Sequence, residues 1–299
     1  GHSVAVVTRG GTWTMALWEG APRRHGETSS ERQRMSAWLP DGERFVTVSD
    51  ADGEERLVVA KASGEGRPKR LRADIGRVLD MAVAPAGADR VAVANHRQEV
   101  LVVDLATGRA QKVASSPFHR IGGLAWSPDG RWLAFGLAES HSGSSLKLYD
   151  TKDAALHDVT NGDFFDGTPA FDPDGKYLAF LSGRVFDPVY DSHYFDLGFP
   201  RGFVPCLVPL AADAADPFAP GRKDAKPVVP GGGDAKPAPT KKGAGNAKKK
   251  PGPEPVRVDL KDIARRVLAF PVPEARYEGL VAVKNRFLFL SVDPTGSLD

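Results

Sequence analysis

Charged residues recur at equivalent positions of a sequence unit that repeats along this 299-residue chain. They stand at or shortly before short apolar segments, which we expect to form the innermost strands of successive sheets. The set comprises Arg32, Arg34, Arg77, Asp80, Arg120, Asp163 and Asp166. If these strands surround a channel, its arginines would attract carboxylates through their summed field, or bind one through the planar guanidinium fork. The alternative is that these side chains bridge neighbouring sheets or face solvent.

A serine next to a histidine could act as a nucleophile if the imidazole accepted the hydroxyl proton. His141 and Ser142 are adjacent in a Ser- and Gly-rich stretch, residues 139–145. No Gly-x-Ser-x-Gly turn surrounds them, and such a composition is typical of a hairpin tip. We therefore expect a loop here and assign no catalytic residue to the chain.

Metal-ligating residue types gather in one other segment, at Asp187, Asp191, His193 and Asp196. Carboxylates and imidazoles bind zinc or hard cations. Their spacing matches neither a calcium loop nor a zinc motif, and aspartates also form turns. We expect a structural loop that crosses one face of the fold, without metal or cofactor.

The positions of these residues follow from a recurring turn, Pro-Asp-Gly or a degenerate form of it. Its prolines are Pro40, Pro85, Pro128 and Pro173, which are 45, 43 and 45 residues apart. Pro sets φ near −65°, Asp bonds its own backbone, and Gly accepts a positive φ. One such turn per unit of this length predicts an all-β fold, a β-propeller with one four-stranded sheet, or blade, per repeat.

The ends of the chain depart from the repeat. Residues 4–7 and 12–18 resemble middle strands of a blade whose first strand is missing, whereas residues 279–283 and 286–292 begin a further blade. The sequence thus predicts about four complete blades and two partial ones, in a single propeller region over residues 1–299. Because an open propeller leaves strand edges exposed, we expect these blades to belong to a larger ring. A helical apolar period occurs only at residues 259–268.

Composition limits the compartment and the partners. The single cysteine, Cys206, excludes an intrachain disulfide and fits a reducing compartment. It lies between apolar residues, and we expect an inert core thiol. The chain contains no apolar run of 18 residues, and we expect neither a membrane-spanning segment nor a signal peptide.

Residues 221–253 differ from the rest in composition. They contain nine Lys and Arg against two Asp, a net charge of +7, so a chain total of +2 leaves −5 on the remainder. The segment is rich in Pro, Gly and Ala and has almost no large apolar side chains, which predicts a disordered insertion. A nucleic-acid or anionic-surface arm is the alternative. The segment lacks interleaved aromatic residues, so we expect no nucleic-acid partner.

The stretch after the last Pro-Asp-Gly turn indicates a protein family more specifically than the turn itself does. Residues 182–202 include Phe186-Asp187-Pro188 and are followed by an apolar strand at residues 205–210. This stretch resembles the second, seven-bladed propeller of tricorn-type proteases. Residues 6–10, 93–97 and 259–263 resemble other parts of that propeller, so the resemblance covers the chain apart from the basic insertion.

The resemblance implies a fold and a function. Tricorn-type proteases are large cytoplasmic serine peptidases that assemble as hexamers, and two propellers precede their catalytic part, which includes a PDZ-like domain. The seven-bladed propeller gates or guides peptides toward a buried active site, and the catalytic residues belong to later domains. The implied partners of this chain are peptides in transit and the other domains of the same polypeptide.

Two other hypotheses remain open from the residues alone. The Pro-Asp-Gly turn also occurs in TolB-like propellers, which would make the chain a stand-alone module that binds a protein partner. It occurs as well in oligopeptidases, in which a propeller caps a hydrolase domain. A Gly-x-Ser-x-Gly turn downstream would favour the oligopeptidase.

Overall fold

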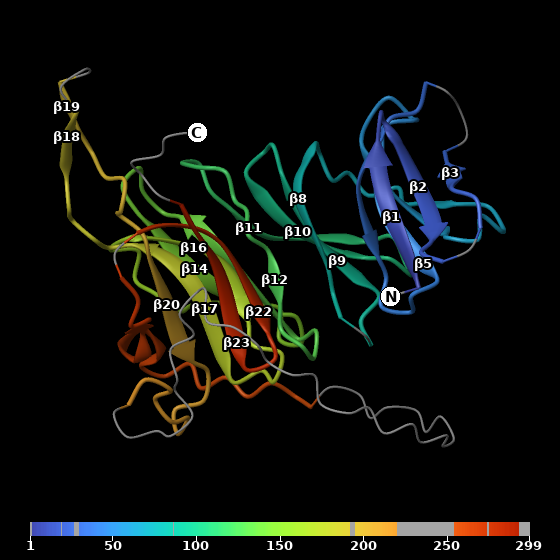
Figure 1. Cartoon of the computed structure of the whole chain (residues 1–299). Coiled ribbons are helices and arrows are strands. Elements are labelled where there is room, and N and C mark those ends of the chain that lie inside the picture. Colours follow the sequence, from blue (N-terminus) through green and yellow to red (C-terminus); the bar gives the residue numbers. More distant parts are fainter. Residues whose placement is uncertain are drawn as a thin grey trace.

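The computed structural model of the chain describes residues 2–18, 20–26, 30–85, 87–191, 195–219, 254–273 and 275–292. These residues form β-strands and a single short 3-10 helix, which confirms the predicted all-β class (Figure 1). Within these ranges, no helix has the length and apolar character to cross a membrane. The predicted disordered insertion, residues 221–253, lies outside the described residues.

The first three sheets are antiparallel and follow one another along the chain. The N-terminal sheet consists of β1 (Ser3–Thr8), β2 (Gly11–Ala16) and β3 (Arg23–His25). The next sheet consists of β4 (Gln33–Trp38), β5 (Arg44–Ser49), β6 (Arg56–Lys61) and β7 (Lys69–Arg70). The third consists of β8 (Val78–Val83), β9 (Arg90–Asn95), β10 (Glu99–Asp104) and β11 (Ala110–Ser115).

Two further four-stranded units and a hairpin complete the series. One unit is β12 (Ala125–Trp126), β13 (Trp132–Ala138), β14 (Ser144–Asp150) and β15 (Ala155–Asp158). The other is β16 (Phe165–Phe171), β17 (Tyr177–Gly183), β20 (Val204–Pro209) and β21 (Leu268–Ala269), and the hairpin is β22 (Arg276–Val283) with β23 (Arg286–Val292). A single parallel pairing, Ser144 with Phe165, joins the two units into one sheet. Four four-stranded units flanked by smaller sheets agree with the predicted blade count.

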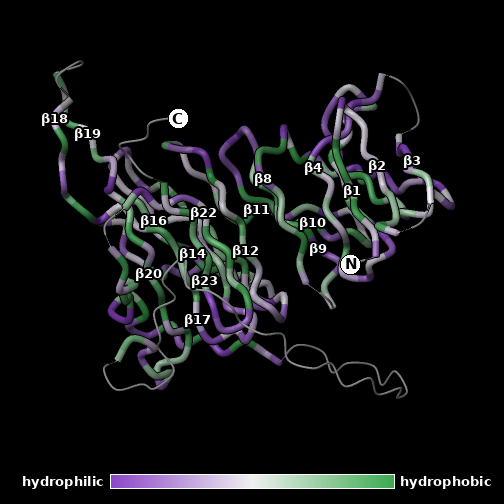
Figure 2. The backbone as a smooth tube through the Cα atoms, viewed as in Figure 1, coloured by the Kyte–Doolittle hydropathy of each residue, from purple (hydrophilic) through white to green (hydrophobic). Residues whose placement is uncertain are grey.

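The hydrophobic core lies between successive sheets. In β9, Val91 and Val93 pack toward the preceding sheet, whereas Ala92 and Ala94 pack toward the following one. Because successive side chains of a strand point to opposite faces, a strand between two sheets must be apolar on both. This explains the uninterrupted apolar runs of the middle strands, which Figure 2 shows as hydrophobic stretches between more hydrophilic loops.

The recurring turn forms as predicted in the three units that keep Asp and Gly. The amide of Gly42 donates to Leu39 O at 3.0 Å, and Gly130 and Gly175 make the same bond to Ser127 and Asp172 at 2.8 Å. The three glycines have φ of 73°, 71° and 69°, which explains why glycine occupies this position.

The innermost strands are neighbours in space. β1 contacts β4, and contacts continue from β4 to β8, β8 to β12, β12 to β16 and β16 to β22. β1 is therefore an innermost strand, so the expectation that residues 4–7 form a middle strand was wrong. The N-terminal sheet begins with its first strand, and no described strand pairs with the outer edge of β3.

Two local expectations also need correction. Residues 259–268 form only a one-turn 3-10 helix, η1 (Ile263–Arg266), preceded by Asp262 at φ 54°. Ile263 alone of its residues is buried, and so short a segment cannot sustain an α-helix by itself. The segment expected to cross a face instead forms a hairpin, β18 (Val189–Asp191) and β19 (Asp196–Gly198), which projects away from the sheets (Figure 1).

Candidate functional site

Three of the predicted channel arginines line one pocket between β4 and the start of β8. Arg32 directly precedes β4, Arg34 lies within it, and Arg77 directly precedes β8. The pocket has a volume of about 260 Å³, and Asp50 and Glu55 also line it. We call it the arginine pocket. The repeat places its arginines together because consecutive innermost strands run side by side.

Arg34 is held rigidly in the wall of this pocket. Its Nε donates to Glu55 Oε1 at 2.9 Å, and its Nη2 donates to Glu55 Oε2 at 2.7 Å. Glu55 Oε2 also accepts the amide of Val78 at 2.7 Å, so the pair connects two successive sheets. Since a paired guanidinium has little charge left for a ligand, Arg34 contributes structure more than attraction.

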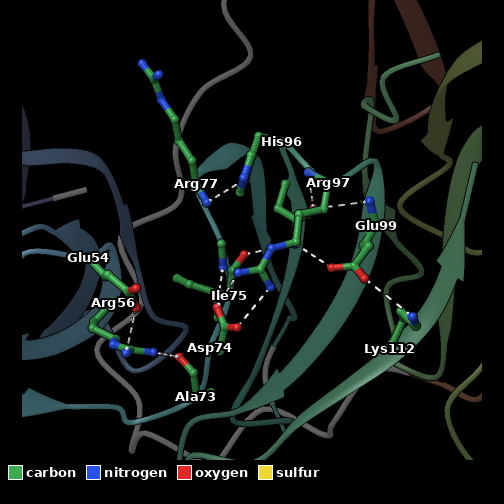
Figure 3. Close-up of polar contacts among 12 residues, drawn as sticks. Glu54, Arg56, Ala73, Asp74, Ile75, Arg77, His96, Arg97, Glu99 and Lys112 are labelled. Atoms are coloured by element: carbon green, nitrogen blue, oxygen red, sulfur yellow. Dashed lines mark hydrogen bonds and ion pairs between the residues drawn. The ribbon is translucent and has the colours of Figure 1, made fainter. Parts of the chain in front are cut away.

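Arg32 and Arg77 differ from Arg34 because their side chains are exposed and uncommitted. Their backbone amides are fixed, Arg32 N–H by Asp50 Oδ1 at 2.7 Å and Arg77 N–H by His96 Nδ1 at 2.9 Å. Neither guanidinium has a hydrogen-bond or ion-pair partner within the described part of the chain. Figure 3 shows the Arg77 side chain extending away from the other labelled residues. Two free cations on fixed backbones can bind an anion.

The charges next to Arg77 show the opposite behaviour. Arg97 donates from both terminal nitrogens to the Asp74 carboxylate, at 2.9 and 3.1 Å (Figure 3). The hydrogen bond from Arg97, together with the Gly76 amide, lowers the pKa of Asp74. Lys112 pairs with Glu99 at 3.4 Å. These groups pair with one another, unlike the guanidiniums of Arg32 and Arg77.

Two of the predicted aspartates have structural partners instead. Asp80 Oδ2 accepts the amides of Gly123 at 2.8 Å and Leu124 at 3.3 Å, which ties β8 to the segment before β12. Asp166 is 2% exposed and accepts a hydrogen bond from the Ser182 hydroxyl. The Asp80 carboxylate therefore connects two successive sheets, and the Asp166 carboxylate is bound within one sheet.

The other two predicted residues lie apart from the arginine pocket. Arg120 is exposed and has no polar partner among the residues that the structure describes. Asp163 is exposed and accepts a bond from the Asn161 side-chain amide at 2.8 Å. The arginine pocket therefore contains Arg32, Arg34 and Arg77 but neither Arg120 nor Asp163.

The sequence candidates for covalent or metal chemistry are not assembled into sites. Ser142 lies 3.4 Å from Ser140 Oγ, and the His141 ring packs against Phe118 at 5.0 Å between centroids. No bond between that imidazole and a serine hydroxyl occurs in the described ranges. His193 lies outside the described residues, and the residues inside them form no group of three metal-ligating side chains.

Sequence reasoning missed a regular bulge in the innermost strands. Five positions before the turn proline stand Met35, Gly123 and Thr168, with φ of 54°, 70° and 51°. The pairing register of β4 and β16 skips at this point. Counting back from the turn would have found the position, but the residue types at it share nothing that marks a bulge.

Comparisons with known proteins agree with this architecture. The chain matches the family described as the tricorn protease second beta propeller domain over residues 1–299. It is 41% identical over 307 residues to Tricorn protease homolog 1 of Streptomyces coelicolor, a match that covers 98% of this chain and 27% of that protein. It is 28% identical to the Tricorn protease homolog of Saccharolobus solfataricus, covering 100% of this chain and 25% of that protein.

A solved structure shows the same fold. The crystal structure of the tricorn protease superimposes with a TM-score of 0.77 at 22% identity, covering 98% of this chain and 26% of that one. The chain therefore spans about a quarter of the length of the relatives that it matches. The family predicted from residues 182–202 is confirmed: the chain belongs to the family of tricorn protease second β-propeller domains.

Proposed function

We propose that this chain is a non-catalytic propeller module of a tricorn-like, cytoplasmic serine peptidase, and that it channels peptides toward a catalytic domain outside residues 1–299. Family membership supports the parent class, and the arginine pocket supports the channelling role. The partners are then peptides in transit and the other domains of a hexameric parent.

The observation that carries the proposal is the pair of uncommitted guanidiniums, Arg32 and Arg77, at the starts of adjacent innermost strands. A peptide always carries a carboxylate at its C-terminus unless it is capped. At about 4 Å and an effective dielectric near 20, one guanidinium attracts it by about 4 kcal/mol before desolvation, and Asp50 and salt reduce this value. Such weak, reversible binding suits passage better than retention.

The end sheets support the proposal that these blades belong to a larger ring. On β1 and β2, Val6 is 46% and Met15 39% exposed, and on β22 and β23, Val281 is 59% and Leu290 61% exposed. Between successive sheets elsewhere in the chain, such apolar faces are covered. Further blades would cover these faces in the same way.

The pocket is tested by peptide binding to the full chain. Fluorescence anisotropy compares one labelled peptide with a free C-terminal carboxylate and the same peptide amidated. We expect the free acid to bind more tightly, and the double change Arg32→Gln with Arg77→Gln to remove about tenfold in affinity, or about 1.4 kcal/mol. Arg97→Gln is the matched control, because that arginine is already paired with Asp74.

Equal affinity for acid and amide would refute carboxylate capture. The channelling role is tested separately, by peptide turnover in a tricorn-like peptidase that contains this propeller. There Arg77→Glu should slow degradation of long peptides, and an unchanged rate would contradict channelling through this pocket.

A further inference from the structure

A second and larger pocket lies between β16 and β22, at the base of the projecting hairpin. Its volume is about 700 Å³. Leu181 and Tyr277 line it from the two neighbouring sheets, and Phe199 and Phe203 line it from the segment after β19. We call it the aromatic pocket. Pockets of this size commonly enclose small ligands or side chains.

The two charged residues that line this pocket are paired with each other. Arg276 is paired with Glu278 at 2.7 Å. The Tyr277 hydroxyl donates to the carbonyl of Pro273, so its ring presents an apolar surface to the pocket. A ligand would therefore be selected by apolar contact, which is the reverse of the selection in the arginine pocket.

Bulges of two innermost strands lie at the pocket. The pairing of β16 with β17 skips from Gly167 to Ala170, and the pairing of β22 with β23 skips from Glu278 to Leu280. Thr168 and Gly279, the bulged residues that line the pocket, therefore have no partner residue in the ladder. The pocket therefore opens where the ladders of both innermost strands are interrupted.

Thr168 has a positive φ, as do Met35 and Gly123 at the equivalent positions of the repeat. It is a β-branched residue at φ 51°, a conformation that costs about 1–3 kcal/mol and persists only where the surroundings impose it. The backbone of Thr168 lies close to Gly123, where a Cβ would be 3.1 Å from Thr168 Cα. The Thr168 side chain is exposed, and it has no hydrogen-bond partner among the described residues. Its hydroxyl is therefore available at the wall of the aromatic pocket.

We propose that the aromatic pocket binds an aromatic or large aliphatic side chain of an extended peptide. This inference rests on the proposed function and deepens it, because it adds a side-chain preference to the passage of peptides. Phe199 and Phe203 are 46% and 44% exposed, so their rings are available to such a guest.

The test uses capped tripeptides, acetyl-Gly-X-Gly-amide, with X as Phe, Ala or Lys, and isothermal titration calorimetry on the full chain. Capping removes the terminal carboxylate, so Arg32 and Arg77 should not affect the result. We expect the Phe peptide to bind about tenfold more tightly than the Ala peptide, and Phe199→Ala or Phe203→Ala to remove most of that difference. Phe195→Ala is the matched control, because Phe195 is 79% exposed on the same hairpin and does not line the pocket.

A substitution that fills the aromatic pocket avoids the loss of packing that Phe199→Ala or Phe203→Ala would cause. Gly198 lines the pocket, and the nearest atom to a Cβ placed there is 3.8 Å away. Gly198→Phe should occupy the pocket and weaken the Phe peptide about tenfold at an unchanged unfolding temperature. Equal affinities for the Phe and Ala peptides, or equal losses from Phe195→Ala and Phe199→Ala, would overturn the proposal. Carboxylate capture by the arginine pocket would survive that outcome, because its test varies only the C-terminus.

Discussion

The arginine pocket and the aromatic pocket occupy equivalent places with opposite chemistry. Each lies between consecutive innermost strands, β4 with β8 in one case and β16 with β22 in the other. The first is small and lined by charged side chains, and the second is larger and lined by rings. The propeller repeat thus fixes where a pocket can form. The side chains that line each pocket fix what it can bind.

The two interfaces between these pockets are closed. Between β8 and β12, Asp80 accepts two amides and the Trp126 indole donates to Ala82 O at 3.0 Å. Between β12 and β16, Gly123 lies against the backbone of Thr168. A pocket is therefore not automatic at an interface, because one carboxylate or one close backbone contact is enough to fill it.

The largest expected effect tests the closed interface. Gly123→Ala would require a left-handed alanine whose Cβ lies 3.1 Å from Thr168 Cα and 3.2 Å from its amide nitrogen. We expect a loss of about 3 kcal/mol in the free energy of unfolding, of which about 1–2 is conformational. Urea denaturation measures it.

Gly279→Ala is the matched control for that change. Gly279 has φ of 63°, but a Cβ there has nothing within 4 Å. We expect a loss of about 1 kcal/mol in the free energy of unfolding, which is the conformational cost alone. Equal losses at the two glycines would show that backbone strain, and not the contact with Thr168, closes the interface.

A smaller effect tests the wall of the arginine pocket. Glu55→Gln keeps the side-chain shape but removes the charge that holds Arg34, whose side chain is only 23% exposed. We expect a loss of about 2 kcal/mol in unfolding free energy, since bonds to charged groups are worth about 1.5–3 kcal/mol. Glu54→Gln should cost less than about 0.5 kcal/mol, because Glu54 is 74% exposed in its pair with Arg56. Similar losses at both sites would contradict a structural role for Arg34.

The smallest expected effect tests whether the core behind the aromatic pocket is dry. Cys206 on β20 lies opposite Phe180 on β17, and the next residue of β17, Leu181, lines the aromatic pocket. Burial raises the pKa of the Cys206 thiol to about 11. The thiol pKa in the unfolded chain is near 8.5, so the unfolded state loses the proton first as pH rises. The stabilisation from the protonated thiol is complete below pH 8.5 and disappears as the pH passes about 11.

The measurement compares the wild type with Cys206→Ala from pH 8 to pH 11. The difference in unfolding free energy between the two should shrink as the pH rises, and a thiol reagent at pH 8 should label the folded protein slowly. Rapid labelling of the folded protein would indicate that water reaches this core.

Local patterns explain what was predictable. The turns at Gly42, Gly130 and Gly175 close within four residues, so their spacing gave the number and length of the blades. The gathering of Arg32, Arg34 and Arg77 was accessible because the repeat aligns the starts of innermost strands. The commitment of Asp80 to the Gly123 amide was not, because that partner lies 43 residues away.

The same reasoning explains the errors. Residues 4–7 are an uninterrupted apolar run, the pattern of the middle strands, so the sequence did not mark them as an innermost strand. The projection of β18 and β19 was equally hidden, because a hairpin forms by local pairing whether or not a sheet lies beneath it.

The sequence alone determined the all-β class, the blade repeat, the family and the arginines at the strand starts, because each depends on residues close together in the chain. Only the tertiary structure decided which interfaces close and which remain open. The aromatic pocket brings Thr168, Phe199 and Gly279 together from three separate segments. Its existence depends on how neighbouring sheets pack, and packing between distant segments leaves no periodic or compositional signal.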